Sequence, residues 1–291
     1  MISREIAQKV KMIEVTTKKA VTASFAGDYA SAFKGRGMEF DEVREYQIGD
    51  DIRAINWMVT ARTGKPHTKR FVEERELTIL LAVDLSGSGT FGSGERSKQE
   101  IAAEVSAVLA LAAVKNNDRV GLLIFTDRME LFVPPRKGMT HVLRIVRDLL
   151  VFEPKGRGTN ISRAMESMEN LLKRRAVVFL VSDFIDEGFE HALEVSARRH
   201  DLVALSLRDP RELELPNVGL VTVTDAETGE PRVIDTANEA VRTIYAAENA
   251  ARIGELENTF ARHGIDHVPI TPGEDYVVPL GRLFRTREAR R

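Results

Sequence analysis

From Leu77 onward, the chain alternates between two kinds of segment that differ in the spacing of their hydrophobic residues. Short runs rich in Val, Ile, Leu and Phe predict buried strands, and segments with an apolar residue at every third or fourth position predict helices between them. The predicted strands span residues 77–84, 120–126, 129–133, 176–183, 202–207 and 267–270. Helical spacing links Ile101, Val105, Val108 and Ala112, and further along it links Val142, Ile145, Val146 and Leu149. This alternation is typical of an α/β fold in which helices cover both faces of a mostly parallel central sheet.

Two β-hairpins depart from this alternation. Only Asp127 and Arg128 separate the second and third predicted strands, whereas a parallel crossover needs about a dozen residues or more. We therefore expect one antiparallel strand in the central sheet. Residues 220–236 place a polar turn between two runs of alternating residues, which predicts a second hairpin. We expect this hairpin to be inserted at the edge of the fold, before a long helix.

Residues 1–76 lack the alternation of strands and helices that marks the main α/β domain, which we assign to residues 77–291. They contain a predicted first helix and then a polar, glycine-punctuated segment with the only Trp of the chain. We expect short strands on either side of the Gly-Asp-Asp turn at 49–51 and a small core of Tyr46, Ile48, Ile52, Ile55 and Trp57. The opposite charges of this segment are carried by Arg44, Asp50, Asp51, Arg53 and Arg62. They suit an ion-pair lattice or a docking surface, and the simplest interpretation of residues 1–76 is a structural appendage.

Composition excludes several classes of protein. Of the 291 residues, 43% are hydrophobic and 30% are charged, as in an ordinary soluble globular chain. A net charge of −2 gives no overall field that would attract nucleic acid or an anionic membrane. The absence of cysteine excludes disulfides, thiolate zinc sites and cysteine nucleophiles. The first residues do not resemble a signal peptide, and no run approaches the roughly 18 apolar residues of a membrane span, so we expect a cytoplasmic protein.

The stretch DLSGSGTFGSG, residues 84–94, follows a buried strand and carries the candidate chemistry. A phosphate-binding loop of the Walker type requires a lysine after its last glycine, but Glu95 follows Gly94. The spacing of Gly87, Gly89 and Gly92 also matches a dinucleotide-binding turn, which is a weak signal without the rest of that motif. Nucleotide binding is therefore disfavoured, and a metal site or a simple turn remains.

The metal interpretation depends on oxygen atoms from three separate segments. Asp84, Ser86 and Ser88 alternate along the first segment, so their side chains can face one point. Thr159 lies in a glycine-rich loop before a helix, and Asp183 ends another predicted strand. Loops at the carboxyl edge of an open α/β sheet meet in one place, and hard oxygen ligands suit Mg²⁺. Taken singly, these residues are also ordinary turn, cap and strand-end residues.

Together these five residues resemble the metal-ion-dependent adhesion site of von Willebrand factor A domains, and the resemblance covers residues 77 to about 271. It implies a von Willebrand A-like sheet with one antiparallel strand and a site for Mg²⁺, Mn²⁺ or Ca²⁺. It also implies that Ser86 and Ser88 bind the ion directly, that Thr159 binds it directly or through water, and that the two aspartates bind it largely through waters.

A second resemblance covers the segment that precedes the main domain. The sequence EFDEVREYQIGDDIRAINWMVTARTGK is similar to the signature of the bacterial domain-of-unknown-function family 58. The matching positions are Glu39, Phe40, Arg44, Glu45, Tyr46, Gly49, Asp50, Arg53, Asn56, Trp57, Ala61 and Arg62. Proteins of this family are typically encoded beside MoxR-type AAA+ ATPases. The resemblance therefore implies a partner or adaptor of such an ATPase, with a chaperone-like or maturation role.

Site chemistry favours binding over catalysis. Neutral hydroxyls provide three of the five side chains, so a divalent ion held there keeps positive charge for an acidic side chain of a protein partner. None of the six histidines lies within a few residues of the motif to act as a general base. We therefore expect a non-enzymatic, metal-assisted protein-binding module. The alternatives are a metal-dependent phosphoesterase that uses Asp84 and Asp183 and a structural scaffold with an empty site.

Overall fold

The computed structural model describes residues 12, 17, 19–33, 39–72, 76–90, 96–224 and 230–290. The chain divides into two compact units, of which the smaller is Phe33–Leu77 and the larger comprises Met1–Ala32 and Thr78–Arg291. Helix α2 (Ala23–Phe33) therefore belongs almost wholly to the larger unit, whereas the sequence analysis grouped the first helix with the appendage. The two units are described separately below.

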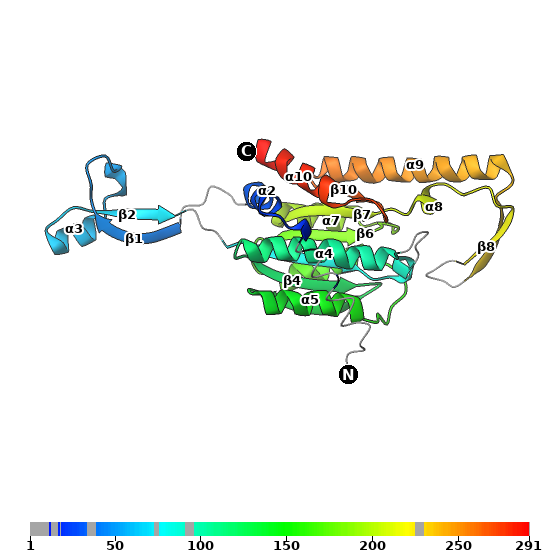
Figure 1. The fold of residues 1–291 in the computed structure, drawn as a ribbon, viewed down its shortest axis with the longest axis horizontal. Coiled ribbons are helices and arrows are strands. Elements are labelled where there is room, and N and C mark those ends of the chain that lie inside the picture. Colours follow the sequence, from blue (N-terminus) through cyan, green and yellow to red (C-terminus); the bar gives the residue numbers. More distant parts are fainter. Residues whose placement is uncertain are drawn as a thin grey trace. The chain divides into compact units, whose positions relative to one another are not determined.

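A six-stranded sheet forms the centre of the larger unit (Figure 1). Its strands are β3 (Thr78–Asp84), β4 (Arg119–Phe125), β5 (Met129–Arg136), β6 (Val177–Ser182), β7 (Asp201–Leu207) and β10 (Asp266–Ile270). They lie in the order β10-β7-β6-β3-β4-β5. Strand β5 pairs with β4 in antiparallel orientation, and all other neighbours are parallel. The predicted strands, their mostly parallel arrangement and the single antiparallel strand are thus confirmed.

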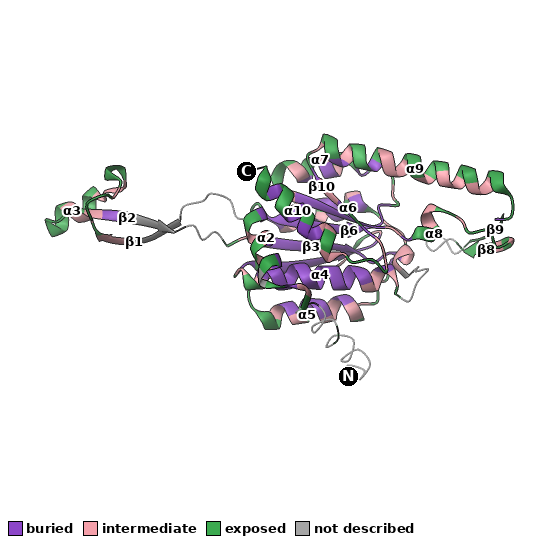
Figure 2. Ribbon diagram, turned by 45° about the horizontal axis from the view of Figure 1, so that its top comes forward, coloured by how far each residue is buried: buried purple, intermediate pink, exposed green. Residues whose placement is uncertain are grey.

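Helices cover both faces of this sheet. Successive residues of a strand point to opposite sides, and both sides of the central strands are buried. The helices are α4 (Lys98–Lys115), α5 (Met139–Val151), α6 (Ile161–Leu171), α7 (Glu190–Arg199), α8 (Pro210–Leu213), α9 (Glu239–Arg262) and α10 (Val277–Ala289). Leu80, Ala82 and every second residue of the neighbouring strands form one core with α6, α7 and the end of α9. Helices α4 and α5 contact the sheet and each other on the other side. Figure 2 shows buried residues concentrated in the sheet and in α4.

Helix α2 is held against the C-terminal helix and the start of β4. The ring of Phe284 in α10 lies 5.2 Å from that of Phe25 and 5.7 Å from that of Tyr29, measured between ring centroids. The Tyr29 hydroxyl donates to Asp118, which directly precedes β4. Aromatic packing of this kind buries large apolar area, which explains why α2 folds with the sheet. No helix among the described residues is long and apolar enough to cross a membrane.

The second predicted hairpin is also present. Strands β8 (Leu220–Thr224) and β9 (Pro231–Asp235) pair in antiparallel orientation as a separate two-stranded sheet. Helix α9 follows directly, as expected, and residues 225–229 of the turn lie outside the described part of the chain.

The smaller unit differs from the prediction. Strands β1 (Glu39–Glu45) and β2 (His67–Val72) form an antiparallel pair, and a short 3-10 helix (Ile52–Ala54) and α3 (Trp57–Thr63) lie between them. Strands therefore lie on both sides of the Gly-Asp-Asp turn, as expected, but β2 follows it only after the 3-10 helix and α3. The expected core is wrong, because Ile48, Ile52 and Trp57 are exposed.

Polar capping explains this result. The Asp51 carboxylate accepts from the backbone N–H of Arg53, and the Asn56 side chain accepts from that of Val59. Such caps favour a helix start at both places. Of the expected charged lattice, the structure shows the ion pair of Arg44 with Asp50 at 2.7 Å.

Candidate metal-binding site

The predicted site residues Asp84 and Asp183 lie at the carboxyl edge of the sheet. Asp84 is the last residue of β3, and Asp183 directly follows β6. The two strands are parallel neighbours, with Val83 opposite Val181, so the two aspartates meet at one edge of the sheet, as expected. Strand β4 lies on the other side of β3, so the chain order changes direction between β3 and β6. Open α/β folds bind ligands at such a point.

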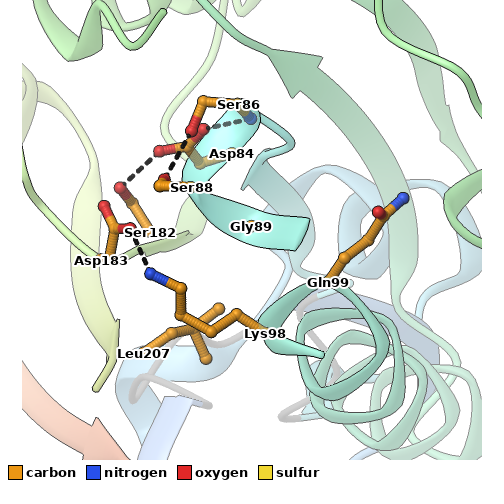
Figure 3. Close-up of a pocket in the computed structure, with 9 residues that line it drawn as sticks. All are labelled: Asp84, Ser86, Ser88, Gly89, Lys98, Gln99, Ser182, Asp183 and Leu207. Atoms are coloured by element: carbon orange, nitrogen blue, oxygen red, sulfur yellow. Dashed lines mark hydrogen bonds and ion pairs between the residues drawn. The ribbon is translucent and has the colours of Figure 1, made fainter. Parts of the chain in front are cut away.

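A small cavity of about 10 Å³ opens between these strand ends, roughly the space of one water molecule. It is lined by Asp84, Ser86, Ser88, Gly89, Lys98, Gln99, Ser182, Asp183 and Leu207. Figure 3 shows the side chains of Asp84, Ser86, Ser88 and Asp183 around this space. Four of the five predicted site residues therefore surround one cavity.

Two hydrogen bonds fix the Asp84 carboxylate. Its Oδ2 accepts from the Ser182 hydroxyl at 2.7 Å, and its Oδ1 accepts from the backbone N–H of Ser86 at 2.9 Å. Burial and the negative charge of Asp183 raise the pKa of Asp84 to about 7, although these hydrogen bonds act in the opposite direction. Two carboxylates that share a dry site repel each other, so this site favours the arrival of a cation.

Hydrogen bonds hold the hydroxyl-bearing segment that directly follows β3. The hydroxyls of Ser86 and Ser88 lie 3.0 Å apart, at the start of the 3-10 turn η2 (Gly87–Thr90). The backbone N–H of Gly87 donates to the carbonyl of Arg157 at 2.7 Å. The stretch is thus a turn, as its glycines suggest, and its hydroxyls converge on the cavity. Residues 91–95, which include Gly92, Gly94 and Glu95, lie outside the described residues.

Thr159 is close to this edge but does not line the cavity. It lies in the loop between α5 and α6, the same loop that accepts the hydrogen bond from Gly87. Asn160, the next residue, caps α6 by accepting from the backbone N–H of Arg163. The fifth predicted residue, Thr159, therefore lies in a loop next to the cavity and not in its lining.

A network around Glu130 supports the Thr159 loop. The Glu130 carboxylate accepts from the backbone N–H groups of Lys155 and Gly156 and from the Thr126 hydroxyl, at 2.7–3.2 Å. A Cβ atom added to Gly156 would lie 2.2 Å from the Thr126 hydroxyl oxygen and 2.0 Å from a carboxylate oxygen of Asp127. Only glycine fits here without a shift of the loop.

The turn after β6 aims Asp183 toward the cavity. Its Oδ1 accepts from the backbone N–H of Ile185 at 3.1 Å. Phe184, between them, has a φ of 56°, which is strained for a bulky residue. Its ring is buried against Phe260, with ring centroids 5.1 Å apart, and this packing holds the turn.

Lys98 and Glu212 are site residues that the sequence analysis missed. The Lys98 ammonium donates to Asp183 Oδ2 at 2.7 Å and to Glu212 at 2.6 Å. Burial alone would lower the pKa of Lys98, but the charges of Asp183 and Glu212 outweigh burial and raise it. Lys98 is the first residue of α4 and belongs to no motif in the sequence. Its burial in the structure is what marks it as a site residue.

The family model for "Protein of unknown function DUF58" matches residues 42–254. The chain belongs to this DUF58 family. The uncharacterized protein Rv1480 of Mycobacterium tuberculosis is 30% identical over 286 residues, which cover 97% of this chain and 90% of the relative. The uncharacterized protein YeaD of Bacillus subtilis is 24% identical over 176 residues, which cover 60% of this chain and 42% of YeaD.

Among solved structures, the conserved hypothetical protein BatB of Bacteroides thetaiotaomicron is similar to this DUF58 protein with a TM-score of 0.48 and 16% identity. The match covers 74% of this chain and 100% of BatB. An aerotolerance-related membrane protein of Bacteroides fragilis matches with the same TM-score and 17% identity.

Gly156→Ala tests the support of the Thr159 loop. We expect a loss of about 1–3 kcal/mol in the free energy of unfolding, because the added methyl group overpacks against Thr126 and Asp127. Urea unfolding measures the change. Gly254→Ala in α9 is the matched control, since a Cβ there meets nothing within 4 Å. Equal stability of the two variants would contradict the close approach at Gly156.

Asp84→Asn tests the buried charge. The stability that neutral Asp84 contributes is complete below the ordinary pKa of 3.8 and is lost as the pH rises toward about 7. In EDTA, we expect the wild type to lose about 3 kcal/mol more than Asp84→Asn between pH 5 and pH 8, because the loss is about 1.4 kcal/mol per pH unit up to the folded pKa of about 7. Urea unfolding at both pH values measures this, with exposed Asp275→Asn as the control. Parallel pH profiles of the wild type and Asp84→Asn would refute the assignment.

Proposed function

We propose that this protein is a von Willebrand A-like binding module that uses a divalent cation, Mg²⁺ first of all, to bind an acidic side chain of a protein partner. The observation that carries the proposal is the convergence of the Ser86 and Ser88 hydroxyls with two buried carboxylates on one cavity. The strand order and the antiparallel edge strand agree with the resemblance to von Willebrand A domains.

The chemistry of the donor set fits such an ion. No group of three or more His, Cys, Asp or Glu within the described ranges is placed to hold a metal, so binding depends on hydroxyls as well as on carboxylates. Hydroxyl and carboxylate oxygens are ligands that Mg²⁺ accepts. Asp84, Asp183 and Glu212 together also carry more negative charge than Lys98 neutralises. Ser86, Ser88, Asp84 and Asp183 would hold the ion, and Thr159 would approach it from the neighbouring loop.

A bound ion would supply a positively charged position that a partner's carboxylate can occupy. In this proposal that position would lie at the edge of the sheet, next to the start of the loop that follows β3. None of the described residues that line the cavity is a histidine, so these residues offer no imidazole base for hydrolysis. This favours binding over a phosphoesterase. The family resemblance makes a MoxR-type AAA+ ATPase the first candidate partner, in a chaperone-like or maturation role.

One observation favours a second candidate, a structural scaffold without a bound metal. The Lys98 ammonium already pairs with Asp183 at 2.7 Å. A buried carboxylate is tolerated when it is paired and also accepts hydrogen bonds, as Asp183 does from the backbone N–H of Ile185. A calorimetric titration separates the two candidates.

Isothermal titration of the purified protein with Mg²⁺ and with Mn²⁺ tests the binding module. We expect saturable binding that disappears in Asp84→Ala with Ser86→Ala, because the pair removes a charge and a hydroxyl from the cavity. The control is Asp275→Ala with Ser167→Ala, which removes a carboxylate and a hydroxyl that do not line the cavity. Absence of binding to the wild type, or binding that survives the first double variant, would support the scaffold instead.

A pull-down with a purified MoxR-type AAA+ ATPase tests the partner. We expect a complex in Mg²⁺ that is lost in EDTA and in Asp84→Ala with Ser86→Ala, since both treatments remove the bridging cation. Replacing the ATPase's acidic contact residue by its amide should have the same effect. A complex that is unchanged by EDTA would contradict a metal bridge.

A further inference from the structure

Within the described part of the chain, Lys98 is the one cationic side chain that lines the site cavity. It is the first residue of α4, directly after the N-cap Ser97. Its side chain is only 1% exposed. In Figure 3 the ammonium group reaches across the cavity toward Asp183. A lysine so deeply buried is rare unless it is paired with a negative charge. The role of Lys98 therefore depends on its two partners, Asp183 and Glu212.

The two partners differ in their relation to the site. Asp183 lines the cavity and is 4% exposed, whereas Glu212 belongs to the short helix α8 and is 20% exposed. The ammonium lies 2.7 Å from Asp183 Oδ2 and 2.6 Å from Glu212 Oε1. It therefore has one partner inside the site and one at its margin.

Both carboxylate oxygens of Asp183 already accept a hydrogen bond, and the one on Oδ2 comes from a cation. The donor to Oδ1 is the backbone N–H of Ile185, and the donor to Oδ2 is the ammonium of Lys98. A divalent ion that used Oδ2 would meet the ammonium at short range, and like charges repel strongly where water is excluded. Occupation of Asp183 by both cations is therefore unfavourable.

We propose that Lys98 is a tethered cation that competes with the divalent ion for Asp183 and withdraws to Glu212 when the ion binds. This inference rests on the proposed metal-binding function. The lysine stem is long and flexible, and Glu212 is already within hydrogen-bond distance, so the ammonium can leave Asp183 without becoming unpaired. Lys98 thereby sets the ion concentration at which the site fills. It also couples filling to α8, which contacts α9.

The decisive variant is Lys98→Met with Glu212→Gln. It removes one charge of each sign, so the net charge of the site stays the same while Asp183 is released. We expect Mg²⁺ and Mn²⁺ to bind at least about tenfold more tightly than in the wild type, as measured by isothermal titration. Lys173→Met with Glu166→Gln is the matched control, because both of these residues are exposed, and its affinity should equal that of the wild type.

Each outcome of the titration has a distinct meaning. Tighter binding by the variant, with a wild type that binds, supports competition by Lys98. Binding by the variant alone overturns the proposed function of the wild type, and with it the withdrawal of Lys98. Equal or weaker binding by the variant, with a wild type that binds, overturns the inference and leaves the proposed function standing. Absence of binding by both proteins overturns the proposed function and the inference with it.

A crystal structure of the wild type with Mn²⁺ provides a second measurement, which does not require the variant to fold. We expect the distance between Lys98 Nζ and Asp183 Oδ2 to increase beyond the 4 Å limit of an ion pair, with the bond to Glu212 retained. An ammonium that stays on Asp183 beside a bound ion would overturn the proposal.

Discussion

Two buried aspartates end neighbouring parallel strands, and the repulsion between their carboxylates is the constraint from which the other features of the site follow. The pairing of β3 with β6 places Asp84 and Asp183 at the same edge of the sheet, so the fold itself creates the concentration of negative charge. Burial and this repulsion raise the pKa of Asp84 to about 7. The surrounding donors offset this negative charge. They are the hydroxyl of Ser182, the backbone N–H of Ser86 and the ammonium of Lys98.

The hydroxyl of Ser182 links the two strand ends. It donates to the Asp84 carboxylate at 2.7 Å and accepts from the backbone N–H of Phe184 at 3.0 Å. The turn that aims Asp183 at the cavity is therefore connected to the neighbouring carboxylate. The unfavourable φ of Phe184 is offset by the burial of its ring in the core. Backbone strain at this point belongs to the geometry of the site and does not reflect poor packing.

The strands and the convergence of the two aspartates could be predicted from the sequence, because buried parallel strands give long apolar runs and their carboxyl ends meet at one edge. Lys98 and Glu212 could not, since they lie 114 residues apart and neither stands out within its own segment. The smaller unit was predicted wrongly for a local reason. Its short apolar pattern suggested a core with Trp57, but the side-chain caps from Asp51 and Asn56 decide the backbone there.

The buried lysine also bears on what a metal could do for this protein. Where an ion is the only compensation for buried carboxylates, the fold depends on the ion, and binding free energy becomes folding free energy. Here Lys98 already pairs with Asp183, and hydrogen bonds already satisfy Asp84. The sheet edge is therefore stable with the ammonium in place, and an ion that displaces it changes the charge presented at the surface without being needed for folding. Such a site is suited to reversible, concentration-dependent binding of a partner, because the competing charge is part of the same chain and is always present.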